Sequence, residues 1–216
     1  MIKVLIADDE SLVRAGLRAI LTSDPNIEVV AEARNGAEAV NQARTLRPDV
    51  VLMDIRMPGT DGLTATEEIS RWQDAPQVLV LTAFNRDEHI YTALRNGAAG
   101  FLLKDTPPRD LTAAVHTVAD GNAVLAPSIT RRMISHFNQG ADSRLHAQRK
   151  LAALTPRERE VLAALAEAQS NAQIALSLHL SEATVKAHVS QIMAKLNAAN
   201  RVQAAIIAHQ AKTPSS

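Results

Sequence analysis

The first 120 residues alternate short apolar runs with amphipathic stretches, and no other feature of the sequence limits the possible folds so strongly. The runs are rich in Val, Ile and Leu and lack alternating polar residues, as expected for strands buried on both faces of a parallel sheet. They are Ile2–Ala7, Ile27–Ala31, Val50–Met53, Val78–Leu81 and Phe101–Leu103. Predicted helices alternate with them at Leu12–Leu21, Gly36–Leu46, Leu63–Trp72, Arg86–Asn96 and Asp110–Ala119. The pattern predicts a doubly wound (flavodoxin-like) α/β domain with a five-stranded parallel sheet.

The rest of the chain has no strand pattern. Residues 122–150 indicate a linker, in which Pro127 opens a possible helix and a polar stretch follows. From Thr155 onward the pattern is wholly helical, with a capping box at its start and a second N-cap at Ser181. It divides into four helices near 155–168, 171–178, 181–196 and 200–211. We therefore expect an α/β domain at 1–121, a linker at 122–150 and a small all-α domain at 151–216.

Composition excludes several classes of protein. The chain has no cysteine, which rules out disulfides, thiolate metal sites and a cysteine nucleophile. No apolar run approaches the roughly 18 residues of a membrane-spanning helix, and the N-terminus lacks a signal-peptide pattern. These features predict a cytoplasmic protein without a membrane partner.

The formal net charge of zero hides an asymmetry. Residues 1–130 carry 18 acidic and 12 basic side chains, whereas the rest of the chain carries 5 acidic and 11 basic ones. An acidic body followed by a mildly basic tail suggests two roles in one chain, although chance variation of surface charge is the alternative.

Polar residues stand at the end of four of the five apolar runs. They are Asp8 and Asp9 after the first run, Asp54 after the third, Thr82 after the fourth and Lys104 after the fifth. The carboxyl ends of parallel strands meet at one edge of the sheet, which is where open α/β sheets bind ligands. Taken singly, each residue has a simpler explanation as a helix cap or a solvent-facing side chain. Taken together, they predict one pocket.

The residue types in this pocket suit phosphoryl transfer to a carboxylate. Three carboxylates repel one another unless a cation is present, and Mg²⁺ is the hard divalent ion that suits such oxygen ligands. Asp54 is then the nucleophile, because carboxylates can form aspartyl-phosphate. Asp8 and Asp9 hold the cation, and Lys104 and Thr82 bind the remaining phosphoryl oxygens.

These residues and their neighbours closely resemble the receiver domain of two-component response regulators. The resemblance covers about residues 1–120 and is carried by Asp8-Asp9, Asp54-Ile-Arg-Met-Pro58-Gly59, Leu81-Thr82-Ala83 and Gly100-Phe-Leu-Leu-Lys104-Asp105. It implies phosphotransfer to Asp54 from a cognate sensor histidine kinase, with Mg²⁺ (or Mn²⁺) as cofactor. The receiver then catalyses its own phosphorylation and dephosphorylation.

The same resemblance implies two further roles. The backbone carbonyl of Arg56 becomes an additional metal ligand beside Asp8, Asp9 and Asp54. Phe101 takes the position of the family's switch aromatic, which turns inward when Thr82 moves toward the phosphoryl group. A plain core role for Phe101 is the alternative.

Two enzyme classes fit the sequence less well. A metal-dependent phosphatase of the haloacid-dehalogenase type needs a second carboxylate two residues after its nucleophile, and Arg56 stands there. A nucleotide-binding enzyme is disfavoured because the chain has neither Gly-x-Gly-x-x-Gly nor a P-loop. The chain is therefore expected to be a regulator.

Segment 181–196 has two different faces on a helical wheel. Val185, Val189, Ile192 and Leu196 form a stripe that we expect to be buried. The opposite face holds Ala and Ser, with Lys186 and Gln191 flanking it. A face of this kind can approach DNA closely, and the short helix before it completes a helix-turn-helix. A four-helix module that binds only protein remains the alternative from geometry alone.

The tail resembles the LuxR-type DNA-binding domain. Its motifs are Leu154-Thr-Pro-Arg-Glu-Arg-Glu-Val161-Leu162, Ser170-Asn171, Leu180-Ser-Glu-Ala-Thr-Val-Lys-Ala-His-Val189 and Lys195-Leu196. With the receiver, the chain is identified as a member of the NarL/FixJ-type response regulators: a transcriptional regulator that binds promoter DNA as a homodimer, on paired half-sites, once it is activated. The expected DNA contacts are Thr184, Lys186, Ala187, Ser190 and Gln191. The expected dimer contacts are Val202, Ala205, Ile206 and His209.

The tail departs from the family pattern at three positions. Relatives usually carry a basic residue and an acid where this chain has Ala172 and Gln173, and many carry a basic residue at the position of Ser190. Fewer neutralised phosphates predict a shallower salt dependence of DNA binding. A tail that acts through protein contacts alone is the second interpretation that these departures leave open.

Overall fold

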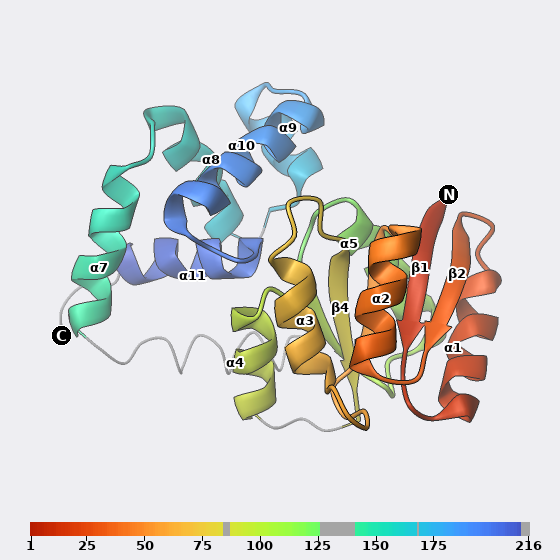
Figure 1. Cartoon of the computed structure of the whole chain (residues 1–216). Coiled ribbons are helices and arrows are strands. Elements are labelled where there is room, and N and C mark those ends of the chain that lie inside the picture. The colour runs from red at the N-terminus through yellow and green to blue at the C-terminus, as the bar shows by residue number, and fades with distance from the viewer. Residues whose placement is uncertain (84–86, 126–140, 168, 213–216) are drawn as a thin grey trace. The chain divides into compact units, whose positions relative to one another are not determined.

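The computed structural model describes residues 1–83, 87–125, 141–167 and 169–212 (Figure 1). The chain divides into two compact units, Met1–Ala126 and Pro127–Ser216. The helix predicted to open at Pro127 lies outside the described residues. Within the described ranges, every helix is too short or too polar to cross a lipid bilayer.

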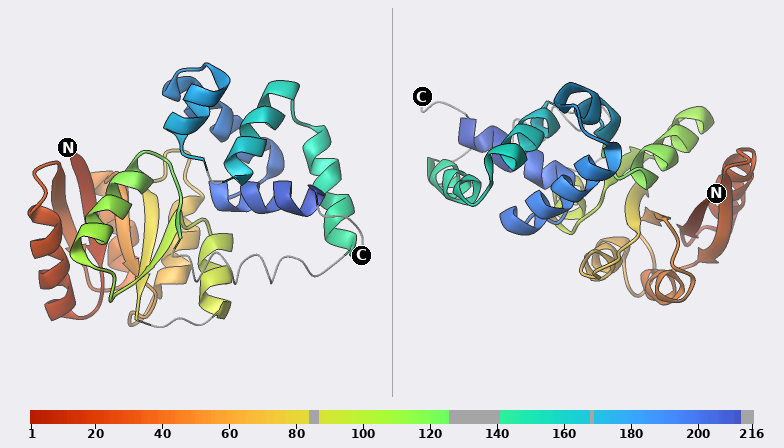
Figure 2. Two further views of the ribbon diagram at one scale, coloured as in Figure 1. Left: turned by 180° about the vertical axis from the view of Figure 1, so that it is seen from behind. Right: turned by 90° about the horizontal axis from the view of Figure 1, so that it is seen from above.

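The first unit is a parallel sheet with helices on both faces. Its strands are β1 (Ile2–Ala7), β2 (Ile27–Ala33), β3 (Val50–Asp54), β4 (Gln77–Thr82), β5 (Gly100–Leu103) and β6 (Val124–Leu125). Its helices are α1 (Ser11–Thr22), α2 (Gly36–Leu46), α3 (Gly62–Ser70), α4 (Asp87–Arg95) and α5 (Pro108–Ala119). The strand order is β2-β1-β3-β4-β5-β6. Helices α1 and α5 cover one face, and α2, α3 and α4 cover the other (Figures 1 and 2).

The five predicted strands are all present, but the prediction of a five-stranded sheet is wrong because the sheet has six strands. The additional strand, β6, pairs in parallel with β5, Gly100 facing Val124 and Phe101 facing Leu125. Two half-buried residues leave no recognisable apolar run in the sequence. This strand forms only because α5 returns the chain to the edge of the sheet.

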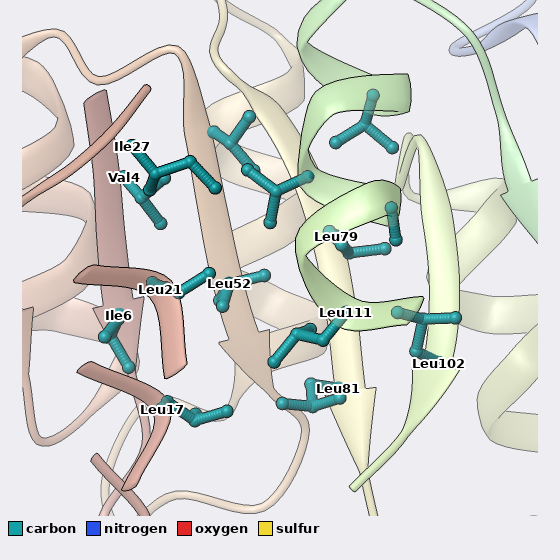
Figure 3. Packing of buried hydrophobic residues seen from close by; sticks show 14 of the residues in the cluster. Val4, Ile6, Leu17, Leu21, Ile27, Leu52, Leu79, Leu81, Leu102 and Leu111 are labelled. Carbon is teal, nitrogen blue, oxygen red and sulfur yellow. The ribbon is translucent and has the colours of Figure 1, made fainter. Parts of the chain in front are cut away.

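The core between the sheet and the α1/α5 layer is aliphatic. Strand residues such as Val4, Leu52 and Leu79 pack there against Leu21 of α1 and Leu111 of α5 (Figure 3). Burying this apolar surface contributes on the order of 25 cal/mol per Å². It holds the strands in register and so fixes where their carboxyl ends meet.

In the part of the second unit that the structure describes, all regular elements are helices. They are α7 (Ala141–Ala152), α8 (Pro156–Ala166), α9 (Asn171–Leu178), α10 (Glu182–Leu196) and α11 (Arg201–Lys212). The last four agree with the predicted helices. Three of them begin at side-chain caps, with capping boxes at Thr155 and Ser170 and an N-cap at Ser181. Val161, Ile174 and Ile192 lie in their shared core.

Helix α7 occupies part of the segment that the sequence analysis interpreted as a polar linker. Its residues are polar overall, so the apolar periodicity that reveals a helix is weak. Contact with α11 supplies the missing stabilisation, and Ala147 is buried there, with 2% of its surface exposed. Residues 141–150 are therefore helical and lie in the second compact unit.

Candidate phosphoacceptor and DNA-binding sites

The polar residues predicted to form one pocket lie at the carboxyl edge of the sheet. Asp8 follows β1, Asp54 ends β3, Thr82 ends β4 and Lys104 follows β5. The strand order reverses direction between β1 and β3, so Asp8 and Asp54 lie at the topological switch point of the sheet. The four strands that carry these residues, β1, β3, β4 and β5, are parallel neighbours. Residues that are almost one hundred positions apart in the sequence therefore meet at one edge of the sheet.

Lys104 connects the carboxylates of this pocket. Its Nζ lies 2.7 Å from Asp8 Oδ2 and 3.4 Å from Asp54 Oδ2. Asp8 and Asp54 are almost completely buried, with exposed fractions of 1% and 5%. The main-chain amide of Lys104 also donates to the carbonyl oxygen of Thr82 at 2.9 Å, which fixes the ends of β4 and β5 to each other.

The environment of Asp54 makes its charged form less favourable than it is in water. Burial is the largest cause of a raised pKa of this carboxyl; Lys104 lowers the pKa, the nearby charge of Asp8 raises it, and the net value is about 6. For Lys104, burial lowers the pKa, but the hydrogen bond to Asp8 and the charges of both carboxylates outweigh it and raise the pKa overall. Among the described residues, the carboxylates of Asp8 and Asp54 thus share the ammonium group of Lys104.

The carboxylates at the end of β1 fit a hard cation. Asp8, Asp9 and Glu10 each offer an oxygen, and these atoms lie within 4.8 Å of one another. Asp9 and Glu10 are exposed, so solvent reaches this side of the pocket. A set of oxygen ligands with residual negative charge and access to water is what Mg²⁺ requires.

Glu10 was not among the predicted site residues. Its Oε1 lies 3.9 Å from Lys104 Nζ, and its main-chain amide donates to Asp8 Oδ1 at 2.9 Å. The run of three consecutive acids at the end of the first strand was the signal that could have identified it.

The two further residues that the resemblance singled out, Arg56 and Phe101, lie in different environments. Arg56 has an exposed side chain in the loop between β3 and α3. Phe101 is completely buried in β5, with 0% of its surface exposed. Complete burial fits both the inward position of the switch hypothesis and the alternative of a plain core role.

Helix α10 separates its two faces as predicted. Val185, Val189, Ile192 and Leu196 are buried against the rest of the unit. The five expected DNA contacts are exposed, namely Thr184, Lys186, Ala187, Ser190 and Gln191. Ser181 caps the helix by accepting from the Thr184 amide at 3.1 Å. The helix start, which is the part that reads DNA in a helix-turn-helix, is therefore well anchored.

The departure at Gln173 has a structural counterpart. Gln173 completes a capping box with Ser170, accepting from the Ser170 amide at 2.8 Å while its own amide donates to Ser170 Oγ at 3.2 Å. A neutral amide thus takes the local role of an acid at this position. At the same helix start, Arg201 of α11 donates to Asn171 Oδ1 at 3.1 Å and to the Gln169 carbonyl at 2.8 Å.

The four predicted dimer contacts on α11 are not equally accessible. His209 is exposed, and Ala205 and Ile206 are half-buried. Val202 is buried within its own unit, with 8% of its surface exposed. The accessible part of the stripe therefore lies toward the C-terminal half of the helix.

An ion pair between the buried Glu158 and the exposed Lys195 fixes α10 to α8. Lys195 Nζ lies 2.7 Å from both carboxylate oxygens of Glu158, and the Thr155 amide donates to the same carboxylate at 2.8 Å. The hydrogen bond from Lys195, followed by that from Thr155, lowers the pKa of Glu158 to about 2.

This pKa predicts an acid-sensitive contribution to stability. Because the folded pKa is below the unfolded one, the stabilisation is complete above about pH 4.5 and is lost as pH falls toward 2. We expect the ionised Glu158 to contribute about 2 kcal/mol to the free energy of unfolding. This value is reduced for the partial exposure of Lys195. Urea denaturation of the second unit at pH 6 and pH 3 should show a smaller loss of stability for Glu158→Gln than for the unmodified chain. Equal losses would contradict this assignment.

Comparison with known proteins gives the same division into two parts. Residues 4–116 match the response regulator receiver domain, and residues 152–208 match the bacterial regulatory proteins of the luxR family. The chain is 36% identical to the nitrate/nitrite response regulator protein NarL of Escherichia coli K12 over 207 residues, which is 96% of this chain and 94% of NarL.

Two solved structures extend over nearly the whole chain. The response regulator ChrA of a heme-sensing two-component system is 40% identical, with a TM-score of 0.54 and coverage of 97% of this chain and 96% of ChrA. A structure of RcsB dimers bound to DNA is 27% identical, with a TM-score of 0.56 and coverage of 98% of this chain and 99% of RcsB.

Proposed function

The chain belongs to the LuxR-type two-component response regulators, with a receiver domain and a DNA-binding domain, and from this premise we propose that phosphorylation of Asp54 controls its binding to promoter DNA. The observation that carries the proposal is the position of Asp54. Its carboxylate is buried at the topological switch point, 3.4 Å from Lys104 and in the field of Asp8. Such a carboxylate is poised to accept a phosphoryl group.

In the proposed reaction, an Asp54 carboxylate oxygen attacks the phosphorus atom of a phosphohistidine on the cognate sensor kinase. A phosphorus–oxygen bond forms, the phosphorus–nitrogen bond breaks, and the kinase histidine recovers a proton. The ammonium group of Lys104 exchanges its ion pair with Asp54 for one with a phosphoryl oxygen. Lys104 therefore donates a charge-assisted hydrogen bond both before and after the transfer. The Thr82 hydroxyl binds a further phosphoryl oxygen.

The proposed ligands of Mg²⁺, or of Mn²⁺ in its place, are Asp8, Asp9, Asp54 and the backbone carbonyl of Arg56. The ion, when bound, neutralises charge on the phosphoryl oxygens. Glu10 adds a carboxylate at the exposed side of the same cluster. Hydrolysis of the phosphorylated Asp54 returns the receiver to its starting state.

For the second unit, we propose that α10 enters the major groove of DNA as the recognition helix. Lys186 and Gln191 reach base edges or phosphates, and the small residues Ala187 and Ser190 allow a close approach. Ile206 and His209 on α11 contribute to a dimer on half-sites about one helical turn apart. As a regulator that binds promoter DNA, the protein is expected to act in the cytoplasm.

The phosphorylation pocket and α10 belong to different units, so control requires two states of the protein with different affinities for DNA. We propose that the unphosphorylated state withholds either α10 or the α11 dimer surface. Phosphorylation replaces the single charge of the Asp54 carboxylate with a phosphoryl group of about −1.5 to −2 charge and favours the open dimer through Thr82, Lys104 and Phe101.

The direct test combines phosphorylation with DNA binding. The purified chain is incubated with Mg²⁺ and a small phosphodonor, and phosphoryl incorporation, mass in solution and binding to its own promoter are measured. We expect one phosphoryl group per chain, conversion to a dimer, and a mobility shift that depends on the phosphodonor. Phosphorylation and dimerisation without any DNA binding would instead assign the tail to protein contacts alone.

Replacing Lys186 with Ala tests the recognition helix. We expect about a tenfold loss of DNA affinity, because a good side-chain contact to DNA contributes roughly 1–3 kcal/mol. If Lys186 binds a phosphate, the salt dependence also becomes shallower by about one counterion. Fluorescence anisotropy with promoter DNA measures both quantities.

Arg159→Ala is the matched control, since it removes one positive charge from an exposed position on α8. It is expected to change affinity only slightly. Equal losses for the two variants would indicate a general effect of net charge and contradict the specific role of Lys186.

A further inference from the structure

Arg14 of α1 contacts the main chain of the acidic loop directly. Its Nη1 donates to the carbonyl oxygen of Asp8 at 2.7 Å and to that of Asp9 at 3.2 Å. Only 11% of the Arg14 side chain is exposed. A planar guanidinium bonded to two successive carbonyls restricts the orientation of both peptide groups. These peptide groups belong to the two residues whose carboxylates are the proposed metal ligands.

Glu32 of β2 provides the counter-charge for this arginine. Its Oε2 accepts from Arg14 Nε at 3.2 Å, and its Oε1 accepts from Arg18 Nε at 2.6 Å. The hydrogen bond from Arg18, and then that from Arg14, lowers the pKa of Glu32 despite partial burial. Glu32 is therefore ionised at neutral pH and orients Arg14 toward the loop.

An irregularity in the sheet brings Glu32 to this position. The pairing of β1 with β2 shifts by one residue, from Val4 facing Val29 to Leu5 facing Ala31. Glu32 consequently faces Ile6, which packs in the core beneath α1 and α5. A one-residue change of register moves side chains to the other face of a sheet. Without the shift, Glu32 would lie on the face opposite Arg14, so the irregularity serves the contact.

We propose that Arg14, oriented by Glu32, is a positioning residue for the magnesium site. It holds the main chain of Asp8 and Asp9 so that their carboxylates are directed for cation binding before the cation arrives. The inference rests on the proposed function of the acidic cluster as the Mg²⁺ site. Groups that orient metal ligands from behind typically change metal affinity about 10- to 100-fold when they are removed.

Charge alone makes the opposite prediction. Arg14 is a cation near a site for a divalent cation, so its removal should strengthen Mg²⁺ binding if only Coulomb repulsion mattered. A positioning role requires that the same substitution weakens binding. The sign of the change therefore separates the two explanations.

The experiment is calorimetric titration of the full-length chain with MgCl₂, without a phosphodonor. We expect Arg14→Gln to raise the Kd for Mg²⁺ about tenfold or more. Arg18→Gln is the matched control, because Arg18 pairs with the same Glu32. In the described part of the chain, Arg18 makes no hydrogen bond to the carbonyl oxygens of Asp8 and Asp9. Its Kd should stay within about twofold of the unmodified chain, and Arg14→Lys, which offers a point charge instead of a planar fork, should fall between.

Circular dichroism establishes that each variant is folded at the titration temperature. If Arg14→Gln does not fold, Arg14→Lys decides the question by the same Kd comparison. Unchanged or tighter Mg²⁺ binding in the folded Arg14 variant would overturn the positioning role and leave the proposed function intact. Failure of the unmodified chain to bind Mg²⁺ would overturn the proposed function and this inference with it.

Discussion

Replacing Asp54 with Asn is expected to abolish phosphorylation, and with it the phosphodonor-dependent dimer and its DNA binding. Asn has nearly the same shape but lacks the nucleophilic carboxylate oxygen. The measurement is phosphoryl incorporation by mass spectrometry after incubation with Mg²⁺ and a phosphodonor, followed by light scattering and a mobility shift. Asp105→Asn is the control, because it removes an exposed carboxylate one residue after Lys104 and leaves the pocket unchanged.

Asp54→Asn is also expected to be more stable than the unmodified chain when the metal is removed with EDTA. Burial raises the pKa of Asp54 to about 6, so at pH 7 the ionised carboxylate destabilises the folded protein, whereas the same charge is fully solvated in the unfolded chain. Removing this charge should add about 2 kcal/mol at pH 7, and the gain should shrink below pH 6 as Asp54 becomes protonated. Full phosphorylation of Asp54→Asn would contradict the proposal that Asp54 is the phosphoacceptor. Loss of the fold of Asp54→Asn in EDTA would contradict the expected gain in stability.

Replacing Gly62 with Ala is expected to damage both the fold and the site. Gly62 is the first residue of α3, and a Cβ atom there would lie 1.8 Å from the carbonyl oxygen of Asp54. That oxygen belongs to the main chain of β3, so the strand end or the helix start must move. Overpacking of this kind costs about 3 kcal/mol. A displacement of Asp54 by about 1 Å should also slow phosphorylation roughly a hundredfold.

Gly16→Ala provides the matched control. Gly16 is exposed in the middle of α1, and a Cβ atom there would meet no heavy atom within 4 Å. Since Ala is favoured over Gly inside a helix, this variant should gain about 0.5–1 kcal/mol. Chemical denaturation and the initial rate of phosphoryl incorporation are compared for both variants. Normal stability of Gly62→Ala would show that α3 can be displaced without cost.

Much of the fold was predictable because its signals are local. Buried parallel strands produce short apolar runs, and helices on their faces produce a 3.6-residue period, so the alternation predicts the domain without knowledge of long-range contacts. The same holds for the helix starts at Thr155 and Ser181, where the capping residues act within one turn. The exposed face of α10 follows from its wheel alone.

Other features depend on partners that are distant in sequence. Strand β6 exists only through its pairing with β5, and α7 is helical because α11 covers it. Val202 belongs to an apolar stripe, but only the packing of the unit decides that it is buried there. Periodicity gives the face of a helix and not the identity of what covers that face.

The sequence by itself determined the class of the fold, the polar residues that meet at the carboxyl edge of the sheet, and the exposed face of α10. Each of these follows from residue types at local spacings or from the rule that parallel strands end at one edge. The tertiary structure alone decided that Glu10 joins the acidic cluster, that Arg14 and Glu32 support it from behind, and that Gly62 lies against the Asp54 carbonyl. These contacts depend on strand register and on atomic distances between segments, which no local pattern of residues records.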